Sequence, residues 1–173
     1  WEYSNFRKIL GNYDMVIISD CEDIFRDRNY SEALRKFVLG GGGALFLADQ
    51  ASPLVDSQAF GLLKEIVPAE KVAEPGISRG DYFLRIGGER NNPLAVIIAE
   101  SDDAESVPPL PAILKGLEPT LESEIAGQLH EPVKGVFPLI SVGIRGKGAS
   151  GVVFGLNVWR WKLSGTAGAN LYE

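Results

Sequence analysis

The stretch that decides the fold reads YSEALRKFVL at residues 30–39, then GGGG at 40–43 and ALFLAD at 44–49. Apolar residues at positions 30, 34, 37 and 38 follow the spacing of one face of an α-helix. The glycines end this helix, because glycine readily leaves the helical conformation. The run that follows is almost entirely apolar. The stretch therefore predicts a helix over 30–39 and a buried strand over 44–49.

A second apolar run lies upstream of this helix. Residues 13–20, YDMVIISD, have the near-continuous apolar character of a strand that is covered on both faces. A strand, a helix and a strand in this order predict a right-handed βαβ unit whose two parallel strands are adjacent or nearly so. Asp20 and Asp49 then end the two strands at the same edge of the sheet.

The rest of the chain changes character toward the C-terminus. Residues 94–99 fit a helix and a strand equally well, and the acidic, proline-rich segment 100–111 predicts a surface loop. The glycine-rich connection 145–148 is typical of a hairpin. Further helices are predicted at 2–10 and 57–67, and further strands at 81–86, 120–129, 137–144 and 151–156.

Together these elements predict a single α/β domain over residues 1–173. The chain is 45% hydrophobic, which is enough for one core. We expect a three-layer sandwich with a mostly parallel sheet and a β-rich C-terminal part.

Composition excludes several classes of function. A net charge of −6 provides no basic surface for nucleic acid. Cys21 and His130 are the only residues of their kinds, so no intrachain disulfide and no Cys/His zinc site can form. We expect no cofactor. The sequence has no apolar run long enough for a membrane helix, and because it begins without Met we expect it to be part of a longer protein.

Two groups of residues are candidates for a ligand site. Asp20 and Asp49, with the neighbouring Gln50, can bind a cation or polar ligand jointly, although strand-end aspartates more often cap the following turn. The tripeptide Trp159-Arg160-Trp161 follows the last strand. If it is extended, Arg160 faces one way and pairs with Asp20 or Asp49, while the two indoles cover a core edge. The alternative is that this tripeptide recognises a ligand or partner.

The order and spacing of several motifs resemble the class I glutamine amidotransferase-like domain of large bacterial membrane proteins. Such proteins often also carry a von Willebrand factor A-type domain. The resemblance implies a flavodoxin-like three-layer fold and a position on the extracytoplasmic face of the membrane, anchored through flanking segments. It rests on WEY at 1–3 with Arg7, YD at 13–14 with Asp20, GGG at 41–43, PPL at 108–110, GKG at 146–148 and WRW at 159–161.

The residues needed for amidotransferase catalysis are missing from this pattern. A glutaminase needs a cysteine on the turn after a strand, with a histidine base. The turn after 44–48 reads Asp49-Gln50-Ala51-Ser52, and Cys21 follows the other strand. Ser52 would require His130 as its base. We therefore expect no glutaminase activity.

The sequence thus predicts a non-catalytic binding or scaffolding domain, whose partners are other domains of the parent protein or a separate protein. The alternative is a hydrolase or sugar-related enzyme that uses Asp20 and Asp49, with or without a metal.

Overall fold

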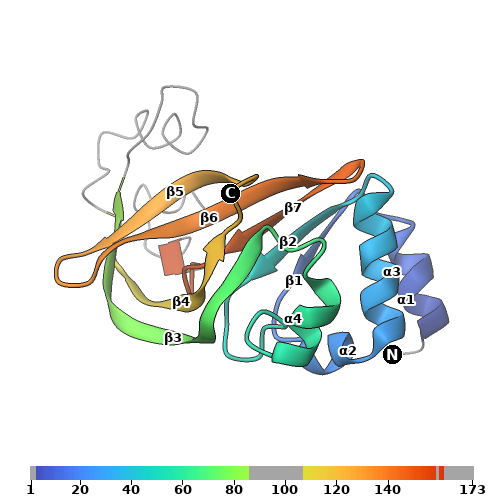
Figure 1. Cartoon of the computed structure of the whole chain (residues 1–173), viewed down its shortest axis with the longest axis horizontal. Coiled ribbons are helices and arrows are strands. Elements are labelled where there is room, and N and C mark those ends of the chain that lie inside the picture. The colour runs from blue at the N-terminus through green and yellow to red at the C-terminus, as the bar shows by residue number, and fades with distance from the viewer. Residues whose placement is uncertain (1–2, 86–106, 159, 162–173) are drawn as a thin grey trace.

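The computed structural model describes residues 3–85, 107–158 and 160–161. They form a seven-stranded mixed sheet with strand order β1-β2-β7-β6-β5-β3-β4 (Figure 1). The helices are α1 (Tyr3–Leu10), α2 (Glu22–Arg26), α3 (Arg28–Leu39) and α4 (Ser57–Leu63). The strands are β1 (Met15–Ile18), β2 (Gly43–Leu47), β3 (Ala69–Arg85), β4 (Leu110–Pro119), β5 (Glu124–Glu131), β6 (Gly135–Arg145) and β7 (Gly148–Val153).

The first half contains the predicted βαβ unit. β1 and β2 are adjacent and parallel, with Ile18 beside Phe46, and α3 connects them. Asp27 caps α3, because its carboxylate accepts a hydrogen bond from the backbone N–H of Asn29 (2.8 Å). After the helix, Gly41 has a φ of +127°, a conformation that favours glycine. The prediction of two adjacent parallel strands with a helical crossover is confirmed.

The labelled helices all pack on one face of the parallel strands. Burial alternates along β2. Ala44 and Phe46 are buried on the helix side, whereas Gly43, Leu45 and Leu47 are only partly buried. The same core cluster takes Ile18 from β1 and Val152 from β7. Its helical members are Leu10, Phe25, Ala33, Leu34, Val38, Ala59, Phe60 and Leu63.

The second half is antiparallel and curls back on the first. In Figure 1, β3 and β4 curve beneath β5 and β6. β4 then bonds to the segment that follows β7: the Leu114 N–H donates to the Phe154 carbonyl (2.8 Å) and the Leu156 N–H to the Ala112 carbonyl (3.0 Å). These bonds close the antiparallel strands into a small barrel. The second core cluster, which includes Tyr82 and Leu129, fills it.

The expected three-layer, mostly parallel, flavodoxin-like architecture is wrong for the described residues. Only the β1–β2 and β2–β7 pairs are parallel, and the other four pairs in the sheet are antiparallel. The physical reason is that an apolar run does not show how many faces of a strand are covered: residues 13–20 were expected to be covered on both faces, but Met15 and Ile17 are exposed on one side of β1. Two predicted strands have other bounds in the structure. The strand expected at 81–86 is the end of the longer β3, and the strand expected at 120–129 is shifted toward the C-terminus as β5.

The predicted loop 100–111 overlaps the start of β4. Leu110 and Pro111 are the first two residues of this strand, and Leu110 pairs with Tyr82 of β3. β4 as a whole was missed. Three prolines at its start and Gly116 inside it hide the strand pattern, and Gly116 takes a φ of +86° at an irregularity in the β3–β4 pairing. The segment 94–99 lies outside the described residues.

Candidate functional site at the ends of the parallel strands

Asp49 ties together the carboxyl ends of β1 and β2. One oxygen of its carboxylate, Oδ2, accepts hydrogen bonds from the Ser19 hydroxyl (2.6 Å) and from the Asp20 backbone N–H (3.0 Å). The other oxygen accepts one from the Ala51 N–H (3.1 Å). Three donors from two strand ends therefore hold this carboxylate in place. This is the capping role that competes with ligand binding at strand-end aspartates.

Asp20 lies beside this carboxylate, in a conformation that few side chains adopt. Its φ is +46°, in the left-handed region where Asp and Asn are tolerated. Loss of solvent around Asp20, then the negative charge of Asp49 and a hydrogen bond between the two side chains, raise the pKa of Asp20. The structure thus brings Asp20 and Asp49 together as predicted.

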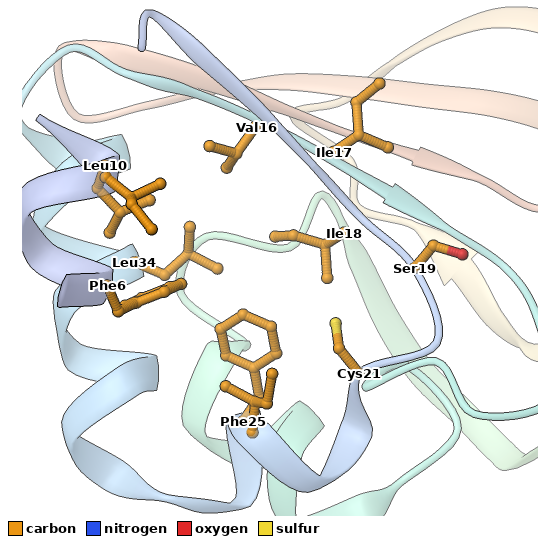
Figure 2. A pocket seen from close by; sticks show the side chains of 11 residues that line it. Phe6, Leu10, Val16, Ile17, Ile18, Ser19, Cys21, Phe25 and Leu34 are labelled. Carbon is orange, nitrogen blue, oxygen red and sulfur yellow. The ribbon is translucent and has the colours of Figure 1, made fainter. Parts of the chain in front are cut away.

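An apolar cavity of about 260 Å³ lies next to this pair, between β1 and the helices. Figure 2 shows Phe6, Leu10, Ile18, Phe25 and Leu34 converging on it, whereas Ile17 points to the other side of β1. Cys21 lines the same cavity. Burial, followed by the charge of Asp49, raises the pKa of the Cys21 thiol to about 11. The thiol is therefore protonated at neutral pH and is a poor nucleophile.

Ser52 and His130 are not assembled into a catalytic pair. The Ser52 hydroxyl is buried and accepts a hydrogen bond from the Leu54 N–H (3.3 Å). His130 lies on β5, where it pairs with Phe83 and Val136. β7 and β6 separate β5 from β2, which puts roughly 14 Å between those strands at the usual spacing. The two residues lie in different halves of the fold.

The Trp-Arg-Trp prediction is wrong in its local structure. Residues 156–158 form a turn, and Arg160 and Trp161 are helical, so the alternation of a strand does not apply. Trp161 is buried in the second core cluster and its indole N–H donates to the Pro108 carbonyl (2.9 Å). Arg160 is exposed, and among the described residues no ion pair joins it to Asp20 or Asp49. Trp159 lies outside the described residues.

The remaining candidate, Gln50, is exposed in the turn directly after Asp49. Sequence reasoning missed Ser19, which makes the shortest hydrogen bond to the Asp49 carboxylate. Its position just before Asp20 was the available signal. Across the described ranges there is no group of three or more His, Cys, Asp or Glu residues that could hold a metal ion.

A second surface lies on the opposite side of the parallel strands, which the labelled helices leave uncovered. Met15 and Ile17 of β1 and Ile144 of β6 are largely exposed, and Val142 is partly so. Leu45, Leu47 and Ile140 share this side through the strand register, and Ile140 also packs against the second core cluster. We call these seven residues the bare face.

No family model and no curated protein sequence matches this chain. Solved structures match it in fold. A cytoplasmic protein of Salmonella typhimurium has a TM-score of 0.71 at 13% identity, covering 96% of this chain and 71% of that one. A second cytoplasmic protein, from Salmonella typhimurium LT2, has a TM-score of 0.62 at 18% identity, covering 86% and 63%.

A catalytic mutant of a GH42 β-galactosidase from G. stearothermophilus also matches, with a TM-score of 0.53 at 14% identity. The match covers 83% of this chain but 19% of the galactosidase. This chain thus spans about a fifth of the enzyme. At such identities the likeness shows a shared fold alone. None of the helices in the described part of the chain is long and apolar enough to span a membrane.

Proposed function

We propose that this domain is a non-catalytic binding or scaffolding module. The observation that carries the proposal is the bare face. Parallel strands are normally covered on both faces, and here one side of β1 presents exposed Met15 and Ile17 beside the partly buried leucines of β2. A contiguous exposed apolar patch of this kind typically marks a surface that binds another protein.

The groups at the strand ends support a non-catalytic role. Asp49 is occupied by three hydrogen-bond donors, and Cys21 keeps its proton at neutral pH. Ser52 is buried away from the only histidine in the chain. Neither Cys21 nor Ser52 has a histidine base within its own half of the described structure, and acyl transfer from glutamine by the amidotransferase route requires one.

The setting follows from the sequence resemblance. We propose that the domain belongs to a membrane-anchored bacterial protein of the amidotransferase-like kind, on the extracytoplasmic side. Its partners are then other domains of that protein or a separate protein. The bare face is uncharged, which suits a protein partner and offers nothing to nucleic acid.

A sugar-related hydrolase is the second candidate. Asp20 has a raised pKa beside Asp49, and the fold recurs within a β-galactosidase. However, two-carboxylate glycosidases hold their carboxyl groups about 5 Å or more apart, with the sugar between them. Here the Asp49 carboxylate accepts hydrogen bonds from the Ser19 hydroxyl (2.6 Å) and the Asp20 backbone N–H (3.0 Å), so the protein itself occupies the carboxylate that would act on a sugar.

Turnover assays separate these candidates. We expect the purified domain to release no ammonia from glutamine and no nitrophenol from nitrophenyl β-galactoside or β-mannoside. Asp20→Asn and Asp49→Asn serve as controls for the hydrolase, and Cys21→Ala for the glutaminase. Release that is present in the parent protein and absent in one of these variants would show that the domain is an enzyme.

A further inference from the structure

The geometry points to a second copy of this chain as the occupant of the bare face, with two sheets packed face to face about a two-fold axis. This inference rests on the proposed binding function and names its partner. Two copies of the bare face can cover each other, because in a two-fold interface the same surface patch of each copy contacts the other. Face-to-face sheets pack about 10 Å apart with their strands within about 30° of alignment.

The size of the bare face fits such a dimer. Met15 is 57% exposed, Ile17 61%, Val142 39% and Ile144 79%. With the partly buried leucines of β2 and Ile140, the bare face presents on the order of 500 Å² of apolar surface. A standard interface takes about 800 Å² from each copy, of which about 65% is apolar in homodimers. The apolar part required is therefore present.

The bare face is also filled and free of charge, as the core of a homodimer interface needs to be. None of the seven residues is charged or polar, and the charge beside them is Glu124 of β5, which pairs with Val142 at the edge of the bare face. Where the strands carry glycine, a neighbouring side chain fills the space. A Cβ added at Gly43 would lie 3.1 Å from Met15 Cγ, and one added at Gly151 would lie 3.0 Å from Leu45 Cδ1.

Charges at the two ends of the strands select the orientation. The carboxyl ends of β1 and β2 carry Asp20 and Asp49. The opposite end carries Lys147 in the β6–β7 hairpin and Asp14 before β1, whose formal charges cancel; Arg145 lies on the other side of β6 from Ile144 and donates to the Thr120 hydroxyl (3.1 Å). A two-fold axis that runs across the strands reverses their direction and places the acidic end of one copy on the hairpin of the other. An axis parallel to the strands would place acid on acid.

The test is the mass of the purified protein in solution, measured by light scattering after size exclusion. At about 100 µM we expect a dimer that dissociates on dilution, as a micromolar association does. Ile17→Lys and Ile144→Lys should each give a folded monomer at the same concentration. Leu121→Lys and Val133→Lys are matched controls, because both residues are exposed apolar positions outside the bare face, and these variants should stay dimeric.

Orientation is tested by Lys147→Glu, which should raise the dimer dissociation constant several-fold at low salt, with a smaller effect at high salt. The inference is overturned if the wild-type protein stays monomeric at about 100 µM. It is also overturned if the Ile17→Lys and Ile144→Lys variants both remain dimeric. Either result leaves the turnover assays untouched. The second-copy inference and the non-catalytic proposal therefore fail separately.

Discussion

Phe46→Ala is expected to lower the free energy of unfolding by about 3–5 kcal/mol, the usual cost of removing a buried phenylalanine ring. Phe46 is fully buried in the centre of β2, in the core cluster between the sheet and the helices. Its matched control is Ile17→Ala on the neighbouring strand, where the side chain lies on the bare face. That change should cost less than about 1 kcal/mol in dilute protein.

Urea unfolding of both variants at low protein concentration provides the comparison, with a midpoint shift at constant slope read as a change in stability. Similar losses for the two variants would mean that the Ile17 side is packed by this chain, and the bare face would not exist. A small loss of stability for Phe46→Ala would instead contradict the burial of this ring between the sheet and the helices.

Gly148→Ala should destabilise the protein by about 3 kcal/mol or more, at the upper end of overpacking effects. A Cβ at this position would lie 2.1 Å from the Gly42 carbonyl oxygen and 2.2 Å from the Val38 carbonyl oxygen. Both obstacles are backbone atoms, so no side chain can rotate away. The end of α3 and the start of β2 would have to separate from the β6–β7 hairpin.

Gly61→Ala is the control for this prediction. Gly61 lies within α4 and has open space where a Cβ would be, so alanine should raise stability by roughly 0.5–1 kcal/mol. Thermal melting of the two variants distinguishes them by sign. A Gly148→Ala protein that melts like its parent would show that the junction between α3 and the hairpin is looser than the structure has it.

The βαβ unit was predictable because each of its signals is local. The helical spacing of Leu34 and Val38, the glycines after residue 39 and the apolar run of β2 all lie within twenty residues. Parallel pairing of β1 with β2 follows, because a helical crossover leaves little other choice. The closeness of Asp20 and Asp49 follows in turn, since parallel strands end at the same edge of the sheet.

The bare face and the barrel could not be predicted in this way. Met15 and Ile17 look no different from Val16 and Ile18 in the sequence, and only the position of the helices decides which pair is buried. Closure of the barrel depends on bonds between β4 and residues 154–156, about forty positions apart. Such long-range pairing leaves no local pattern.

The Trp-Arg-Trp segment shows the same limit at the candidate site. Its alternation suited a strand, but the chain turns at residues 156–158, where Asn157 adopts a φ of +60°. The turn directs Trp161 into the barrel core rather than toward Asp20 and Asp49. Trp161 is buried, as expected of an indole that covers a core edge, but the assumed extended backbone gave it the wrong neighbours.

The central claim is that the folded domain leaves one side of its parallel strands open, and Met15 reports on this directly. It is the only methionine in the sequence and its exposed fraction is 57%. Peroxide oxidises exposed methionine to the sulfoxide, which mass spectrometry counts. In dilute, folded protein we predict a rate about half that of the urea-unfolded chain. Protection by about tenfold or more under the same conditions would show that the chain itself covers the bare face, and would contradict the account.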